Sequence, residues 1–272
     1  MRLRSDADLI EAVTAPADVR AQRIGLWTLF AALVMLCLWR VEFNPSEFAR
    51  GLKQLGWLVS LMLPPDSGGY FLEFSAALVE TVMMALLGAA LATLAAFPLS
   101  LLAARATSPW VPLRFAMRRL FDVIRGVDKL IWALIFVAAT GLGPFAGVMA
   151  LAVGESGVLG KLFADALDDS DARIADSVRA TGGSRVQVLR FALLPQSLPV
   201  MVGLSIYYFE MNVRSAAILG IVGAGGIGFE LADRIRVNEW QQVGFLILMI
   251  FAVVALVDRI SGVVTKRIVR GE

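Results

Sequence analysis

Three polar residues stand in the middle of an otherwise apolar run, Leu198 to Val222. They are Glu210, Asn212 and Arg214. An ionisable side chain at membrane depth is costly and is therefore a functional candidate by default. Glu210 and Arg214 are four residues apart, a spacing that predicts an ion pair on one face of a helix. Two interpretations stay open: a self-neutralising pair that holds the spans together, or polar groups that line a transport path.

The chain has few other side chains that could catalyse a reaction or bind a metal. It contains no histidine, which removes the commonest general base and the commonest metal ligand. Cys37 is the only cysteine, so neither an internal disulfide nor a cysteine-rich metal site is expected. We predict no catalytic residue and no metal site in this chain.

Two stretches nearly match phosphate-binding motifs. Gly160-Lys161 resembles the end of a P-loop, but Glu155 stands where the motif needs glycine and Leu162 where it needs Ser or Thr. Residues 223–228 do fit G-x-G-x-x-G, yet they follow a run of membrane length rather than a strand. We interpret that segment as a re-entrant turn or tight helix crossing beside a pathway, built on Gly223, Gly225, Gly226 and Gly228.

The composition is that of a membrane protein. Of 272 residues, 58% are hydrophobic and 18% charged, against roughly 45–50% and about 25% in soluble domains. The net charge of +2 is too small to indicate a nucleic-acid surface. Runs of about 20 apolar residues can cross a bilayer as helices. The runs predict an all-α protein with six spans: Ile24–Val41, Leu72–Ala104, Leu113–Gly141, Pro144–Leu167, Leu198–Val222 and Val243–Val257.

Some of these runs carry interruptions. We interpret the charged first half of Leu113–Gly141 as a cytoplasmic stem and its second half as the crossing. Asp128 and Lys129, at that junction, are interpreted as side chains that reach toward the interface. The fourth run is expected to be broken at Val153 to Gly157, and Glu80 lies within the second.

Basic residues mark the cytoplasmic side of a membrane protein. They gather before the first span, between spans two and three, between spans four and five, and after span six. These regions fall on one side if both termini are cytoplasmic. The outer segment 42–71 has an apolar stripe at helical spacing, and we expect a helix that ends at Pro64-Pro65. It either lies in the interface or packs on a neighbouring span.

The segment Asp176 to Pro199 is the longest stretch between spans without membrane character. A short helix is expected from Asp176 to Thr181, a break at Gly182-Gly183, and a second amphipathic helix that Pro195 ends. Pro199 would then open the next span. Such an element either lies on the bilayer or docks a partner subunit.

This segment is similar to the EAA loop of ABC importer permeases, which reads E-A-A-x-x-x-G, nine residues, then I-x-L-P. Asp176 takes the place of Glu, Ser177-Val178 replace the alanines, and Gly182, Leu194 and Pro195 match with the right spacing. In that family the loop sits in a groove on the ATP-binding subunit. The resemblance therefore implies that coupling to the ATPase involves Asp176, Ala180, Gly182, Leu194 and Pro195.

Two further stretches, Gly141 to Val148 and Asn212 to Leu231, closely resemble the permease subunit of phosphonate importers, and the resemblance covers roughly residues 72–264. One departure is the turn Gly154-Glu155-Ser156, where permeases of this group often carry histidine. The resemblance implies a phosphonate substrate, with phosphite or hypophosphite as alternatives. On this view Asn212 and Arg214 offer transient donors to a tetrahedral oxyanion.

The resemblance also implies the type I ABC importer fold and alternating access in a bacterial inner membrane. The expected partners are two ATP-binding subunits, which carry ATP and Mg, a periplasmic or lipid-anchored binding protein, and a second permease copy or a paralogue. The domains would be an N-terminal tail, first span and interfacial helix (1–71), a permease core (72–264) with a coupling loop (172–195), and a C-terminal tail (265–272). The remaining rivals are an ion-coupled secondary transporter and, last, a membrane enzyme.

Overall fold

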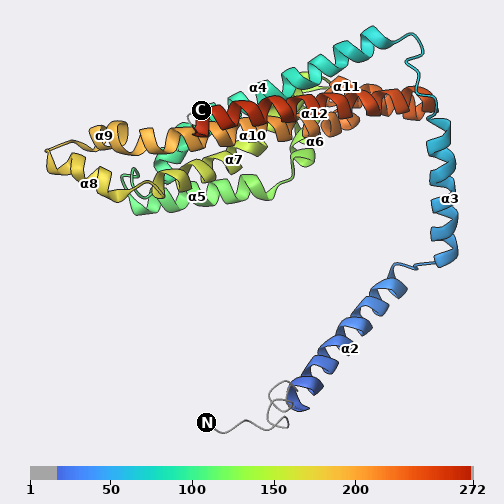
Figure 1. The fold of residues 1–272 in the computed structure, drawn as a ribbon, viewed down its shortest axis with the longest axis horizontal. Helices are drawn as coiled ribbons and strands as arrows, with labels where there is room; N and C mark the ends of the chain where they lie inside the picture. Colours follow the sequence, from blue (N-terminus) through green and yellow to red (C-terminus); the bar gives the residue numbers. More distant parts are fainter. Residues whose placement is uncertain (1–16, 271–272) are drawn as a thin grey trace, which may run out of the picture. The chain divides into compact units, whose positions relative to one another are not determined.

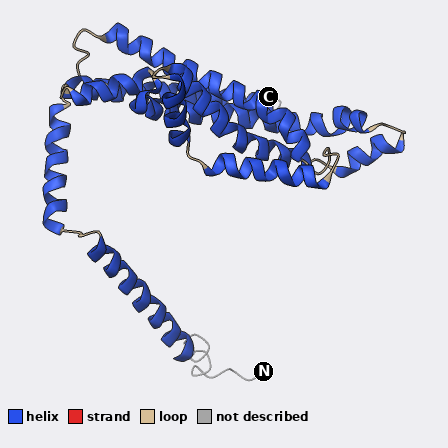
Figure 2. Cartoon of the chain, turned by 180° about the vertical axis from the view of Figure 1, so that it is seen from behind, coloured by secondary structure: helices blue, strands red, loops and turns tan. Residues whose placement is uncertain are grey.

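The computed structural model describes residues 17–270, and every regular element in that range is helical (Figures 1 and 2). Arg2 and Arg4, part of the predicted cytoplasmic N-terminal tail, lie outside the described residues. The chain divides into two compact units, the first ending at Val59 and the second beginning at Ser60.

The first unit holds two helices, α2 (Ala17–Arg40) and α3 (Pro45–Leu61), bent by 69° at their junction. Asn44 caps α3, because its side-chain oxygen accepts the backbone N–H of Ser46 at 3.0 Å. α3 ends three residues before Pro64, close to its expected end. The described side chains of α2 are exposed, as an apolar helix facing lipid would have them.

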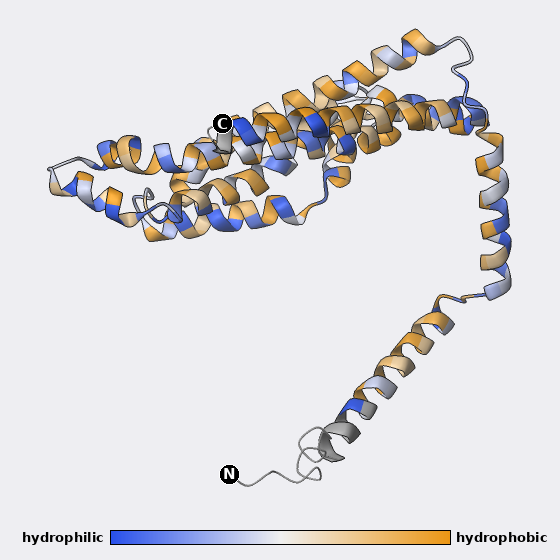
Figure 3. Cartoon of the chain, in the orientation of Figure 1, coloured by the Kyte–Doolittle hydropathy of each residue, from blue (hydrophilic) through white to orange (hydrophobic). Residues whose placement is uncertain are grey.

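The second unit is a helical bundle whose long members are α4 (Phe71–Ala103), α7 (Pro144–Asp168), α10 (Leu194–Leu219) and α12 (Trp240–Arg270). Four helices of the described residues are long and apolar enough to cross a membrane, or five if the bent α2–α3 pair is one span. Figure 3 shows the apolar character of α4 and α12 along most of their length. The six-span count stays a prediction.

The third predicted span consists of two helices, α5 (Val111–Gly126) and α6 (Lys129–Thr140), separated at the charged stretch where the sequence suggested a division. α6 has 12 residues and is about 18 Å long. It is therefore too short to cross a hydrocarbon core of about 30 Å on its own.

The expected break of the fourth run at Val153 to Gly157 is wrong, because α7 is continuous from Pro144 to Asp168. The glycines of α7 instead allow side chains of α5 to pack closely against it. A Cβ at Gly157 would lie 2.8 Å from Ile124 Cγ2, and one at Gly160 would lie 2.5 Å from the ring of Phe121. Glycines three residues apart thus give α7 a flat face on which α5 lies closely.

The expected helix end at Pro195 is also wrong, since helical structure continues from Arg185 into α10 and passes both Pro195 and Pro199. A proline removes a backbone donor and crowds the preceding turn. Here the preceding turn is a π-turn, η1 (Leu189–Leu193). The carbonyls of Ala192 and Leu193 accept hydrogen bonds from the side chains of Gln196 (2.7 Å) and Ser197 (2.9 Å). The wider turn and these side chains let the helix continue.

Candidate functional site

The predicted coupling loop forms an elbow, which we define as residues 172–195. It consists of α8 (Ala172–Ala180), α9 (Arg185–Val188) and η1, and it lies at one end of the bundle (Figure 1). Asp171 caps α8 by accepting the N–H of Arg173 at 2.9 Å, and Ser184 with Gln187 forms a capping box at α9. Gly182 turns the chain between the helices at φ +83°, a conformation that favours glycine.

The elbow presents both charges and apolar side chains outward. Asp176 is exposed and pairs with Arg179 at 2.7 Å, Ala180 ends α8, and Pro195 is exposed next to the half-buried Leu194. The exposed fractions of Ile174, Val186 and Phe191 are 44%, 72% and 60%. Large apolar side chains at the tip of a polar element are typical of a surface that a partner covers.

The opposite side of the elbow is packed into the bundle. Ala175, Val188, Ala192 and Leu193 are buried in one core cluster, together with Phe121 and Phe163 of the bundle and other residues. Gln196 adds a polar link, because its side-chain oxygen accepts the backbone N–H of Asp171 at 2.9 Å. Packed side chains and this hydrogen bond therefore join α8 to the start of α10.

The glycine segment forms a tight reversal. A second π-turn, η2 (Gly220–Ala224), leads into α11 (Gly226–Arg236), with Gly223, Gly225 and Gly226 at positive φ. Gly228 lies so close to the backbone of Ala217 that a side chain there would collide with it. The interpretation of this segment as a re-entrant turn or tight helix crossing beside a pathway stays a prediction.

Two side chains of α4 hold the start of α11. The N–H of Gly226 donates to Glu80 Oε1 at 3.1 Å, and the N–H of Ile227 donates to Thr81 Oγ1 at 2.8 Å. A carboxylate near the N-terminus of a helix is stabilised by the helix dipole. The sequence indicated no partner for Glu80 within its span, because its partner, Gly226, lies 146 residues further along the chain.

A polar cluster of Lys129, Glu155, Asn212 and Ser215 lies between α6, α7 and α10. Lys129 pairs with Glu155, and its Nζ donates to Asn212 Oδ1 at 3.3 Å and to Ser215 Oγ at 3.4 Å. Glu155 and Asn212 are completely buried. The interpretation of Lys129 as a side chain that reaches toward the interface is therefore wrong: its charge is matched by Glu155 inside the bundle.

The expected pair of Glu210 and Arg214 is not among the ion pairs of residues 17–270. Arg214 is exposed, with Nη1 3.9 Å from Met211 Sδ. Glu210 instead lines a cavity of about 370 Å³ between α10 and α12, together with Tyr207, Ser261 and Lys266. Asn212 thus enters the polar cluster, whereas Glu210 and Arg214 lie on another side of α10, because residues four apart share a helix face and the residue midway between them does not.

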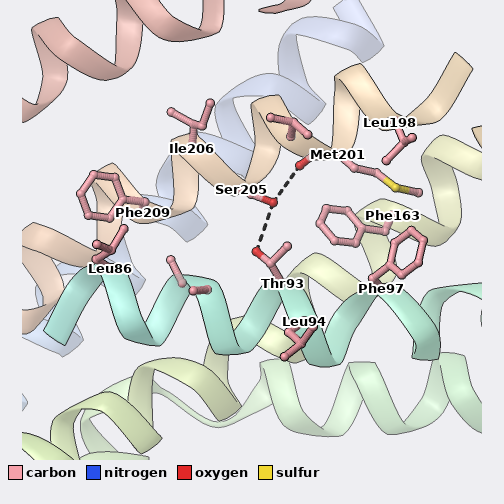
Figure 4. Close-up of a pocket in the computed structure, with 13 residues that line it drawn as sticks. Leu86, Thr93, Leu94, Phe97, Phe163, Leu198, Met201, Ser205, Ile206 and Phe209 are labelled. Carbon is pink, nitrogen blue, oxygen red and sulfur yellow. Dashed lines mark hydrogen bonds between the residues drawn. The ribbon is translucent and has the colours of Figure 1, made fainter. Parts of the chain in front are cut away.

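A larger cavity of about 560 Å³ lies between α4 and α10 (Figure 4). Its walls are mainly apolar, with Phe97, Phe163 and Phe209 among them, and Thr93 donates to Ser205 across it at 3.1 Å. Both hydroxyls already have partners, and an anion there would lose its hydration without gaining charged donors. This cavity suits an apolar occupant rather than an anion.

No group of three His, Cys, Asp or Glu side chains that could hold a metal ion occurs in the described part of the chain.

The family model described as "Binding-protein-dependent transport system inner membrane component" matches residues 96–270, from within α4 through the elbow to the end of α12. The chain belongs to this family. It is thus the membrane component of a bacterial ABC import system, situated in the inner membrane, and it is not itself the enzyme that hydrolyses ATP.

Two relatives align over nearly the whole chain. The phosphite transport system permease protein PtxC of Stutzerimonas stutzeri is 37% identical over 247 residues, which cover 90% of this chain and 89% of that protein. The phosphate-import permease protein PhnE of Mycolicibacterium smegmatis is 36% identical over 254 residues, 93% of this chain but 48% of that protein. The chain therefore spans about half the length of the mycobacterial relative.

The fold agrees with the family. The permease chain of an inward-facing MetNI methionine ABC transporter superposes with a TM-score of 0.62 at 19% identity, covering 72% of this chain and 95% of that chain. The expected all-helical type I ABC importer permease fold is confirmed.

Proposed function

We propose that this permease imports a phosphonate or a related phosphorus oxyanion, with phosphite or hypophosphite as alternatives. The observation that carries the proposal is the 37% identity to a phosphite permease over 90% of the chain. A mycobacterial relative named for phosphate import and further relatives named for phosphite and phosphonate transport share the same element, phosphorus, in their named substrates. Lys129 supplies a positive charge beside the buried Glu155, with its own side chain 28% exposed.

The transporter would contain two ATP-binding subunits, two permease chains and a periplasmic or lipid-anchored binding protein. Each chain has one elbow in the expected position, so two docking elements require two permeases. A second copy of this chain is the simplest arrangement, and a paralogue is the alternative. The domain limits stay as proposed from the sequence, although α12 continues through residue 265 to Arg270.

In this scheme the ATPase binds the exposed side of the elbow. The residues in or next to that interface are Asp176, Ala180, Gly182, Leu194 and Pro195. Closure of the two ATPases would move α8, and the packed inner side of the elbow would tilt α10. Glu210, Asn212 and Arg214 follow on α10, and the glycine reversal at Gly223, Gly225, Gly226 and Gly228 ends it. The proposed mechanism is alternating access, with the reversal as the region that adjusts to the tilt.

The test is ligand-dependent ATP hydrolysis by the purified complex of this chain with its co-expressed ATPase. We expect hydrolysis to rise when binding protein loaded with methylphosphonate or phosphite is added, and not with unloaded binding protein. An ATPase that does not co-purify, together with substrate uptake that depends on a proton or sodium gradient, would favour the secondary-transporter alternative.

A further inference from the structure

In the cluster around Lys129, the ammonium has a hydrogen-bond partner for each of its hydrogens, but neighbouring polar atoms lack partners. Lys129 Nζ has three hydrogens, and its three partners are Glu155, Asn212 and Ser215. Glu155 is the twelfth residue of the 25-residue α7, close to the middle of a predicted span. The charge pair therefore lies at a depth where an unused polar group is expensive.

Apart from Glu155 Oε1, whose contact is the ion pair with Lys129, three buried polar atoms beside this pair have no hydrogen-bond partner among the described residues. Two are donors, Asn212 Nδ2 and Trp132 Nε1, and the third is the acceptor Oε2 of Glu155. Asn212 and Glu155 have no exposed surface. Buried polar groups in proteins are nearly always hydrogen-bonded, so an unpaired set calls for an explanation.

Two of these three residues contact the same ammonium, and the third lies beside the lysine stem. Asn212 and Glu155 both contact Lys129, and Trp132 follows Lys129 by three residues, on the same side of α6. Lys129 and Trp132 pack directly against Gly154, since a Cβ there would lie 3.2 Å from Lys129 Cγ and 3.8 Å from Trp132 Cδ1. The side chain missing at Gly154 thus gives the lysine stem and the indole room beside Glu155.

We propose that Lys129, Trp132, Asn212 and Glu155 form a transient binding site for a phosphorus oxyanion that retains one acidic O–H. The inference rests on the proposed function and names the substrate form that this chain recognises. The anionic oxygens would accept from the ammonium, from Asn212 Nδ2 and from Trp132 Nε1. The remaining O–H would donate to Glu155 Oε2, which satisfies all three unpaired atoms at once.

Glu155 gives this site its selectivity. Monoprotonated phosphite and monoprotonated alkylphosphonates carry the O–H that a carboxylate can accept. Sulfate has a similar tetrahedral shape but no O–H at neutral pH, so its oxygens would face the carboxylate without a proton between them. Because Lys129 is already paired with Glu155, the incoming anion has to compete for the ammonium, which keeps binding weak enough for release.

The first test neutralises the pair in the complete transporter. Lys129→Met with Glu155→Leu removes both charges together, and replacing a buried ion pair by apolar residues is often tolerated or even stabilising. The matched control is Lys161→Met with Asp122→Leu, which removes a pair at 2.6 Å between α7 and α5 whose lysine is as exposed as Lys129, at 28%. In proteoliposomes with ATPase and loaded binding protein, we expect methylphosphonate uptake to fall at least tenfold in the first variant and to persist in the control.

Equal uptake by both double variants, with transport by the wild type, would overturn the site while leaving the proposed function intact. No methylphosphonate or phosphite uptake by the wild type would contradict the proposed function and the site with it.

The second test measures the selectivity directly by phosphorus NMR line broadening of methylphosphonate on the detergent-solubilised complex without binding protein. Sulfate should fail to displace methylphosphonate from the wild type and should displace it from the Glu155→Gln complex, whose amide offers a donor. Equal displacement by sulfate from both complexes, or no broadening with the wild type, would overturn the role assigned to Glu155.

Discussion

Gln196, in the first turn of α10, accepts a hydrogen bond from the backbone N–H of Asp171, the capping residue of α8, at 2.9 Å. Its side-chain nitrogen donates to the carbonyl of Ala192 at 2.7 Å, beside the π-turn. One amide therefore connects the beginning of the elbow to the beginning of a long membrane helix. A link at this position would carry movement from the ATPase into the bundle.

Replacing Gln196 with Leu should weaken coupling more than assembly. The variant loses both hydrogen bonds but keeps the apolar packing of Ala175 and Val188. We expect several-fold less substrate transported per ATP hydrolysed, measured as uptake and phosphate release in the same proteoliposomes. Gln241→Leu, an exposed glutamine in the first turn of α12, is the control. An unchanged ratio in Gln196→Leu would show that the hydrogen bond does not carry the coupling.

The turn at Gly182 gives a second test of the elbow. Its φ of +83° costs a residue with a branched side chain on the order of 1–3 kcal/mol, although a Cβ there meets no atom within 4 Å. Gly182→Val should therefore distort α8 relative to α9 and reduce recovery of the ATPase in a pull-down. Gly182→Asn, which tolerates the left-handed conformation, should retain most of it. Full recovery and normal transport with valine would argue against docking at this turn.

The flat face of α7 predicts a stability effect. A side chain at Gly160 would overlap the ring of Phe121, and overpacking of this kind costs about 1–3 kcal/mol. Gly160→Leu should lower the thermal midpoint of the detergent-solubilised permease by several degrees. Gly262→Leu in α12, where a Cβ has open space, should leave the midpoint nearly unchanged. Similar midpoints for the two variants would mean that α5 and α7 separate at little cost.

The Asp122–Lys161 pair between α5 and α7 predicts an acid dependence. The hydrogen bond from Lys161, at 2.6 Å, holds the pKa of the Asp122 carboxyl below its usual value of 3.8. Because the folded-state pKa is lowered, the contribution of Asp122 to stability is present above the usual pKa and is lost as the pH falls through the lowered one. The thermal midpoints of the wild type and Asp122→Asn should differ at pH 6 and converge as the pH falls below 3.8. A constant difference across this range would contradict the assignment.

Local patterns predicted most apolar helices and the turn at Gly182, because hydrophobic length and glycine breaks are properties of neighbouring positions. The first helix of the elbow begins at Ala172, four residues before its expected start at Asp176. Local patterns failed at Pro195, where continuity of the helix depends on a π-turn and on the side chains of Gln196 and Ser197. Local patterns also failed at α7. Its glycines indicated a break, but in the structure they make room for neighbouring side chains, such as the ring of Phe121 beside Gly160.

The polar residues show the limit most clearly. Glu210 and Arg214 were paired by their spacing, whereas the buried carboxylate of Glu155 pairs with Lys129 from a different helix. Which charges meet is decided by the packing of α6, α7 and α10, and a helical spacing rule does not contain that information. Two sequence signals pointed toward the cluster: Asn212 in the middle of the fifth run, and the departure at Gly154-Glu155-Ser156.

We propose that this chain is the gate of an ATP-driven importer of a phosphorus oxyanion. The most direct measurement is accumulation of methylphosphonate or phosphite in proteoliposomes containing this chain, its ATPase and its binding protein, compared with vesicles that lack this chain. We predict accumulation that requires ATP, the binding protein and this chain, and that persists when proton and sodium gradients are abolished. Accumulation that follows an ion gradient without ATP would contradict ATP-driven import. Transport confined to substrates without phosphorus would contradict the assigned substrate class.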